Sequence, residues 1–118
     1  MKRSLPKYLE DIQMSILDIE SYSAGVQSTK DIEDNKLLFD ALCRRFAIIG
    51  EAVYQADKLK KNLPITDKEK IKGLRHIIVH DYDLVRASVI FDIIVNKLQQ
   101  LKKRYKYPFG NRDISLIT

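Results

Sequence analysis

The stretch LPKYLEDIQMSILDI at residues 5–19 decides the fold class of this chain. Its apolar side chains recur at alternating steps of four and three residues, which places them along one face of an α-helix: Leu5, Leu9, Ile12, Ile16 and Ile19. Pro6 suits the first turn of such a helix, where its missing N–H is not needed. The pattern predicts an amphipathic helix that begins at Pro6 and ends near Gly25.

A second, longer helix is predicted from Asp34 to Lys61, after a polar connection over residues 25–35. Its middle is apolar nearly all round, which indicates burial on more than one side. Gly50 lies inside it, and an interior glycine costs about 1 kcal/mol relative to alanine. We therefore expect close helix packing at Gly50, and we expect Cys43 to be a small buried residue.

Two more helices are predicted in the C-terminal half of the chain. The third begins at a capping box formed by Thr66 and Glu69 and ends around residues 80–82. Asp83 suits the N-cap of the fourth helix. The apolar stripe of this fourth helix consists of Val85, Val89, Ile90, Ile93, Ile94, Leu98 and Leu101.

Length and composition indicate a single all-α domain. The chain has 118 residues, of which 45% are hydrophobic and 31% charged, as in ordinary globular proteins. Four glycines and three prolines are too few for the many turns of a sandwich or barrel. We expect an antiparallel bundle of four principal helices over residues 1–105, followed by a loose tail over residues 106–118.

Cysteine content and hydropathy point to the cytoplasm. One cysteine excludes an intrachain disulfide framework and suits a reducing compartment. No apolar run approaches the roughly 20 residues that span a bilayer, and the N-terminus lacks the apolar segment of a signal peptide. The formal net charge of +5 favours an anionic partner, but a moderate charge of this size more often belongs to a solvated surface than to a nucleic-acid site.

The segment GLRHIIVHDY at residues 73–82 holds both histidines and leaves three interpretations open. The i, i+4 spacing of His76 and His80 is that of a metal-binding pair, but no glutamate follows His76 to act as a base. A histidine at a helix end is also explained by the helix dipole, and Tyr82 by packing of its ring on the bundle. The third interpretation is phosphodiester chemistry, with Arg75 holding a phosphate and His80 transferring a proton.

The third interpretation has a geometric difficulty. Arg75 and His80 are five residues apart, which is roughly 140° around an α-helix, so one regular helix does not present both on one face. They share a cleft if the helix end unwinds or if a second copy of the chain lies alongside. RNA supplies its own nucleophile, the 2′-OH, so arginine and histidine suffice in principle without a metal ion.

The string Arg75-x4-His80-x-Tyr82 matches the R-x(4–6)-H-x-Y signature of HEPN-domain ribonucleases, and the chain resembles their HepT-like branch. Three other segments are similar to that family in the same order and spacing. Residues 6–12 resemble its opening helix, residues 45–52 (RFAIIGEA) its R-x-x-x-I-G-E-A block, and residues 71–75 the lead-in to its motif.

The resemblance implies a cytoplasmic toxin of a toxin–antitoxin module, built as a homodimer of helical bundles whose two motifs face each other. Its implied activity is metal-independent endoribonuclease cleavage of RNA, with no cofactor. Its implied partner is a minimal nucleotidyltransferase antitoxin of the MntA type, which silences the toxin by AMPylation of the motif tyrosine. The alternative is a non-catalytic helical accessory subunit that presents substrate, or itself, to a nucleotidyltransferase.

The resemblance also implies a role for each motif residue. Arg75 would bind and stabilise the scissile phosphate, His80 would transfer the proton, and Tyr82 would receive AMP. Four more residues are candidates for supporting the site: His76, Asp81, Glu51 and Arg45. A structural ion pair or an interface contact is the simpler interpretation of the last two.

Overall fold

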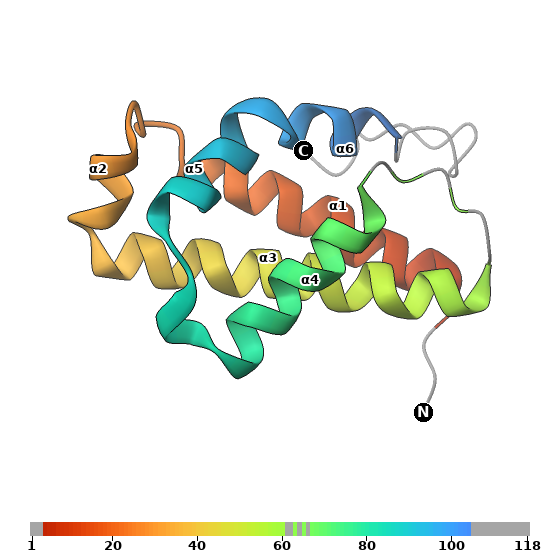
Figure 1. Cartoon of the computed structure of the whole chain (residues 1–118). Coiled ribbons are helices and arrows are strands. Elements are labelled where there is room, and N and C mark those ends of the chain that lie inside the picture. The colour runs from red at the N-terminus through yellow and green to blue at the C-terminus, as the bar shows by residue number, and fades with distance from the viewer. Residues whose placement is uncertain (1–3, 61–62, 64, 66, 105–118) are drawn as a thin grey trace.

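The computed structural model describes residues 4–60, 63, 65 and 67–104. Within these ranges the chain forms six α-helices and one 3-10 helix and has no strand (Figure 1). The long helices are α1 (Leu5–Tyr22), α3 (Lys36–Leu59) and α4 (Lys68–His80), and the fourth principal element is the pair α5 (Ala87–Asn96) and α6 (Leu98–Arg104). The expected all-α bundle with four principal helical elements is confirmed.

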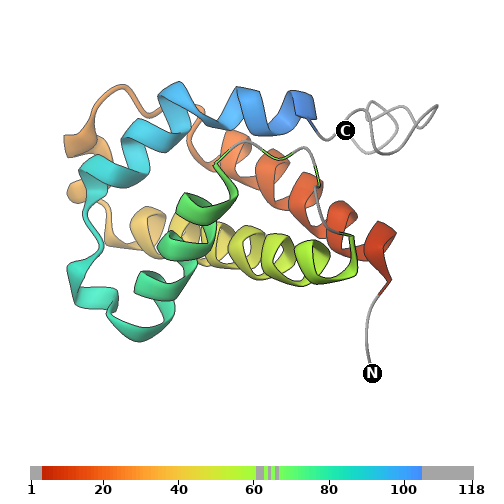
Figure 2. The same cartoon turned by 45° about the vertical axis from the view of Figure 1, so that its right-hand side comes forward.

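The helix α3 is the centre of the bundle. α1 lies along it in the opposite direction, and α4 crosses another of its sides (Figures 1 and 2). α5 contacts α3, and α6 contacts α1, so the last two helices close the remaining side. This arrangement puts α1, α3 and α4 next to one another, and these three helices position the candidate site.

The core follows the predicted stripes of the first two helices, whereas Val89 of the predicted fourth stripe is 45% exposed. Leu9, Ile12, Ile16 and Ile19 of α1 are buried, as the first stripe predicted. The middle of α3 is buried on several sides, through Leu42, Cys43, Phe46, Ile49, Gly50 and Val53. Burial of Cys43 as a small apolar residue is thereby confirmed. Removing the apolar surface of such side chains from water is the main term that holds the helices together.

The predicted polar connection over residues 25–35 contains a short helix, α2 (Thr29–Glu33). The Asp31 carboxylate accepts hydrogen bonds from the backbone N–H groups of Gln27 and Ser28, at 2.8 and 3.2 Å. Ile32 is fully buried against the core. One well-capped turn with a single buried anchor is therefore enough to form a helix in a segment whose composition is mostly polar.

The prediction of the fourth helix is wrong about where the helix starts and about its being continuous. Asp83 is not an N-cap but lies inside the 3-10 helix η1 (Tyr82–Leu84), and Arg86 precedes the first residue of α5. The helical path breaks at Lys97, between α5 and α6. Ile90 and Leu98 are nevertheless both buried, so the break preserves the apolar spacing that had indicated one continuous helix.

Two predictions concern residues that lie wholly or partly outside the described ranges. Thr66, the predicted cap of the third helix, is one of them, and the residue that precedes α4 in the structure is Asp67, with a left-handed φ of 61°. Aspartate is among the few residues that tolerate this conformation. The predicted tail over residues 106–118 is also outside the described ranges.

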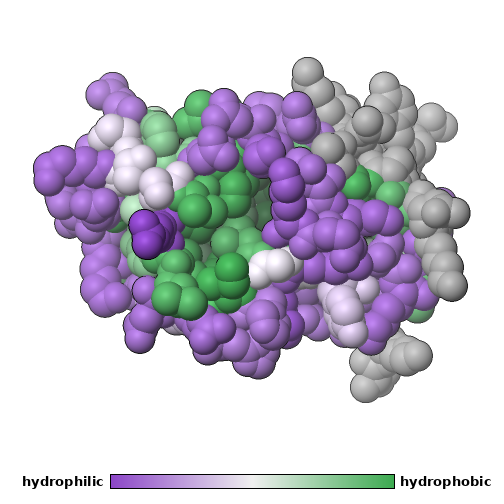
Figure 3. All heavy atoms as spheres, in the orientation of Figure 1, coloured by the Kyte–Doolittle hydropathy of each residue, from purple (hydrophilic) through white to green (hydrophobic). Residues whose placement is uncertain are grey.

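One face of the molecule carries a cluster of apolar side chains. Figure 3 shows apolar side chains gathered in a hollow on the face where α4 and α5 lie in Figure 1. Exposed apolar residues on α4, η1 and α5 include Ile77, Leu84 and Val89. Among the helices of the described ranges, none is both long and apolar enough to cross a membrane.

Candidate functional site

Gly50 of α3 allows α4 to approach closely at the position of Arg75. A methyl group built on Gly50 would collide with the Cβ of Arg75 and would lie 3.1 Å from the Ile71 carbonyl oxygen. The close helix packing expected at this glycine is therefore present, and it occurs at the first residue of the predicted catalytic motif. The position of the Arg75 side chain follows directly from the spacing of the two helices.

Glu51, the residue after Gly50, orients the guanidinium of Arg75. Its Oε2 lies 2.9 Å from Nη2 of Arg75, and its Oε1 accepts a hydrogen bond of 2.9 Å from Nε2 of Gln55. The two charged side chains are 32% and 41% exposed, so a ligand phosphate can reach the guanidinium. An exposed pair of this kind contributes at most about 1 kcal/mol to stability, so its main effect is on orientation.

Arg75 and Glu51 open into a groove of about 310 Å³ between α1, α3 and α4. The groove is lined by Tyr8, Asp11, Arg44, Ala47, Ile48, Glu51, Ala52, Arg75 and Val79. It thus combines two guanidinium groups with an aromatic ring, which are the side chains that bind phosphates and stack on bases. Asp11 and Glu51 add negative charge, so anion binding depends on the two arginines. Sequence reasoning did not single out Arg44 or Tyr8.

The two histidines lie at the end of α4, outside the lining of this groove as far as the described residues define it. His76 and His80 are both exposed, and their ring centroids are 4.6 Å apart. α4 remains helical through His80, so the structure does not show the unwound helix end that would bring His80 to Arg75 within one chain. The described residues contain no group of three or more His, Cys, Asp or Glu side chains placed to hold a metal ion.

Tyr82 lies in a third place, against the first turns of α3. Its ring meets Phe39 edge-on with centroids 5.8 Å apart, and the amine of Lys36 is 5.8 Å from the ring centroid. Its hydroxyl donates a hydrogen bond to Oδ1 of Asp40. Burial, followed by this hydrogen bond to Asp40, raises the pKa of the Tyr82 hydroxyl well above its ordinary value. The Tyr82 ring therefore packs on the bundle, as the second of the three interpretations expected.

The remaining candidates for supporting the site have separate positions. Arg45 does not reach the groove and pairs instead with Asp18 of α1, at 3.3 Å. Asp81 is exposed between α4 and η1, and its backbone carbonyl accepts a hydrogen bond from the N–H of Leu84. Glu51 is the one of these residues that contacts Arg75.

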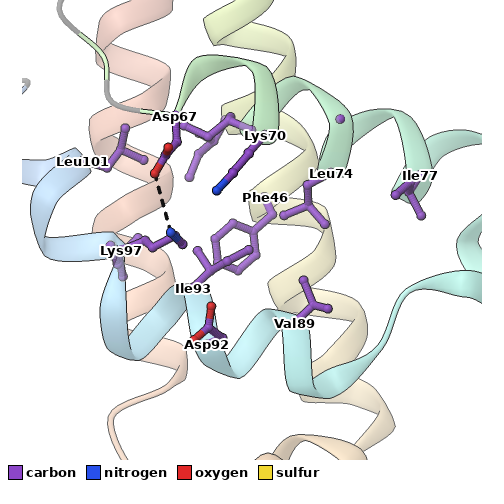
Figure 4. Close-up of a pocket in the computed structure, with 14 residues that line it drawn as sticks. Phe46, Asp67, Lys70, Leu74, Ile77, Val89, Asp92, Ile93, Lys97 and Leu101 are labelled. Atoms are coloured by element: carbon purple, nitrogen blue, oxygen red, sulfur yellow. Dashed lines mark ion pairs between the residues drawn. The ribbon is translucent and has the colours of Figure 1, made fainter.

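A larger cavity of about 490 Å³ lies between α4, α5 and α6, over Phe46 and Ile49 of α3 (Figure 4). Its floor is apolar, and its rim carries Lys70, Asp92 and an ion pair of 3.6 Å between Lys97 and Asp67. None of the motif residues lines it. This cavity is larger than the groove beside Arg75, but the residues that the sequence predicted to carry out the chemistry do not line it.

Comparison with known families places this helical arrangement and its motif in a defined class, the HepT-like ribonucleases. The family described as "Ribonuclease HepT-like" matches residues 12–107, and the chain belongs to this family. The prediction drawn from the motif and the residues around it is confirmed at the level of the family.

Three relatives agree with this assignment. A putative RNase of Methanocaldococcus jannaschii is 29% identical over 86% of this chain and 94% of its own length. A putative RNase of Caldanaerobacter subterraneus subsp. tengcongensis is 32% identical over 90% of this chain and 94% of its own length. A gamma-glutamylcyclotransferase and putative RNase of M. jannaschii is 30% identical over 87% of this chain but only 46% of its own length. No solved structure matches the chain significantly.

Proposed function

We propose that this chain is the toxin of a toxin–antitoxin module, a metal-independent endoribonuclease that cleaves RNA through Arg75 and His80. Its partner would be an MntA-type nucleotidyltransferase antitoxin, which silences the toxin by AMPylation of Tyr82. The proposal rests on one observation, which is that the guanidinium of Arg75 and the imidazole of His80 are both accessible on the same helix. α4 holds an oriented guanidinium in an open groove and an exposed imidazole at its end.

The chemistry needs these two groups and an RNA linkage. His80 takes the proton of the 2′-OH as this oxygen attacks the adjacent phosphorus, and a protonated imidazole gives a proton to the leaving 5′-oxygen. Arg75 stabilises the charge that develops on the phosphoryl oxygens, as a bidentate donor with a permanent charge. Glu51 keeps the guanidinium in place until the phosphate competes for it.

A homodimer is part of the proposal because the groups lie apart in one chain. Arg75 faces α3, whereas the His80 ring stands exposed at the end of a helix that does not unwind. A second copy across a two-fold axis would place His80 of one protomer near Arg75 of the other. The site would then be complete only in the dimer, and a monomeric variant would be inactive.

The experiment is cleavage of a mixed RNA substrate by the purified chain in excess chelator. Arg75→Ala and His80→Ala should each lower the rate by at least about 100-fold, as expected for loss of a phosphate clamp or a proton-transfer group. Arg45→Ala is the matched control, because Arg45 pairs with Asp18 outside the groove, and it should cleave like the parent.

Two results would overturn the assignment. If both motif variants cleave as fast as the parent, other residues carry the reaction. If the parent cleaves no RNA but is AMPylated on Tyr82 by its partner, the chain is the non-catalytic accessory subunit that the sequence left as the alternative. Growth arrest on expression without the partner, relieved by the two motif variants, would support the toxin.

A further inference from the structure

Tyr82 is held by a set of residues that the sequence did not connect with the motif. Lys36, Phe39 and Asp40 stand at i, i+3 and i+4 on α3 and therefore share one face of that helix. Lys36 faces the Tyr82 ring, Phe39 packs against it edge-on, and Asp40 accepts the hydrogen bond of its hydroxyl. These three residues form the Tyr82 cradle, and they lie 42 or more positions before Tyr82 in the sequence.

The cradle keeps the hydroxyl at the surface. The Asp40 side chain is 49% exposed and also pairs with Lys36 at 3.5 Å. A partner enzyme can therefore reach the Tyr82 oxygen from solvent while its proton points to the carboxylate. The ring itself is partly buried, so the oxygen is fixed by packing on one side and by Asp40 at its tip.

The electrostatics of the pair suit transfer of the proton during the reaction. The hydrogen bond from Tyr82, helped by the charge of Lys36, lowers the pKa of the Asp40 carboxyl, so Asp40 is ionised at neutral pH. The Tyr82 hydroxyl stays protonated, because burial and the neighbouring carboxylate oppose a phenolate. Its oxygen becomes a strong nucleophile only if the proton leaves as the new bond forms.

We infer that Asp40 accepts the proton of the Tyr82 hydroxyl during AMPylation, and this inference rests on the modification proposed above. The phenolic oxygen forms a bond to the α-phosphorus of ATP held by the nucleotidyltransferase. The bond from the α-phosphorus to the oxygen bridging to the β-phosphate breaks, and pyrophosphate leaves with the electron pair. The proton passes to Asp40 and from this exposed carboxylate to water. A carboxylate that accepts the hydroxyl proton of the phosphoryl acceptor is also found in protein kinases.

The experiment measures AMP incorporation into the full chain by its partner nucleotidyltransferase, with ATP labelled at the α-phosphate. Initial rates are determined as a function of the chain concentration, and Tyr82 is confirmed as the site by mass spectrometry. Asp40→Asn keeps the size and an oxygen acceptor but removes the negative charge. Asp40→Glu restores a carboxylate. The matched control is Asp34→Asn, another exposed carboxylate paired with a lysine four residues earlier, here Lys30 at 3.1 Å.

Asp40→Asn should lower kcat about 100-fold, the usual effect of losing a general base, with KM for the chain within about twofold of the parent. Asp40→Glu should recover part of kcat, and Asp34→Asn should match the parent. Circular dichroism establishes that all variants are equally helical.

Three results would overturn the inference. Unchanged kcat in Asp40→Asn would show that Asp40 takes no part in the transfer. A raised KM with normal kcat would make Asp40 a contact for the partner. If the parent chain receives no AMP on Tyr82, the proposed modification fails, and the role of Asp40 fails with it.

Discussion

Replacement of Gly50 by alanine tests the link between helix spacing and the candidate site. The change has two opposing effects on stability. Alanine is better than glycine inside a helix by about 1 kcal/mol, but the new methyl group would collide with the Cβ of Arg75 and crowd the Ile71 carbonyl oxygen. Because the colliding atom is the first carbon of the side chain, α3 and α4 must move apart, and overpacking of this kind costs about 1–3 kcal/mol.

Gly73→Ala is the matched control for this variant. Gly73 also lies in a helix interior, but nothing lies within 4 Å of a methyl group built there. The helix-propensity gain is the same at both positions, so the difference between the two variants isolates the collision. We expect Gly73→Ala to be more stable than Gly50→Ala by about 1–3 kcal/mol, which corresponds to roughly 4–12 °C in melting temperature for a chain of this size.

The two glycine variants should also differ in RNA cleavage. Separation of α3 from α4 moves Arg75 relative to Glu51, and a shift of about 1 Å at a reacting group can cost about 100-fold in rate. Urea unfolding followed by far-UV circular dichroism measures the stability, and cleavage is measured at a temperature where both variants are folded. If Gly50→Ala unfolds at the same urea concentration as Gly73→Ala, the methyl group at position 50 does not force α3 and α4 apart.

Four further predictions concern two charged residues of the groove and the buried thiol of Cys43. Glu51→Gln should change the free energy of unfolding by less than about 1 kcal/mol, because the ion pair between Glu51 and Arg75 is exposed. It should nevertheless slow RNA cleavage about tenfold, because Arg75 loses the partner that orients its guanidinium. Equal cleavage rates for this variant and the parent would rule out an orienting role for Glu51. Arg44→Ala should weaken RNA binding and reduce the slope of the logarithm of the binding constant against the logarithm of the salt concentration by about one, because Arg44 lines the groove. Arg45→Ala is the control and should leave this slope unchanged, because Arg45 pairs with Asp18. Identical slopes for Arg44→Ala and the parent would exclude Arg44 from the RNA interface. Burial raises the pKa of Cys43 to about 11 from 9.0, so the folded chain should react with thiol reagents at pH 8 about 100-fold more slowly than the unfolded chain. The Cys43 contribution to stability is constant below pH 9 and is lost as the pH rises toward 11, so Cys43→Ala should lose less stability than the parent between pH 9 and 10, before the raised pKa of Tyr82 adds a decline of the same sign.

Periodicity predicted the helices well wherever one side of a helix meets the core. The α1 stripe from Leu9 to Ile19 is buried as expected, because the burial of one face forces the spacing of its apolar residues. The same signal failed at Lys97, since a break that keeps Ile90 and Leu98 in the core leaves the pattern intact. Helix continuity is decided by local backbone conformation, which hydropathy does not record.

The sequence singled out the motif residues and Glu51, but not the other residues that surround them. Arg75, His80 and Tyr82 are close in sequence, and the motif drew attention to all three. The structure places them at three positions, with Arg75 against Gly50, His80 exposed at the end of α4, and Tyr82 beside Asp40. These partners lie on α3, and although the sequence had indicated close packing at Gly50, only the packing of α4 and η1 on that helix shows which residue of the motif each partner meets. A sequence motif cannot specify contacts that depend on the angle between two helices.

The hydrogen bond between Tyr82 and Asp40 has a consequence for the AMPylated form of the chain that we propose. An esterified phenol has no proton to donate, and its phosphodiester would bring a second negative charge next to the Asp40 carboxylate. The AMPylated Tyr82 ring would therefore move toward solvent, and the 3-10 helix η1 that contains Tyr82 would shift with it. Silencing would then change the shape of the surface met by RNA or by a second copy, in addition to its charge.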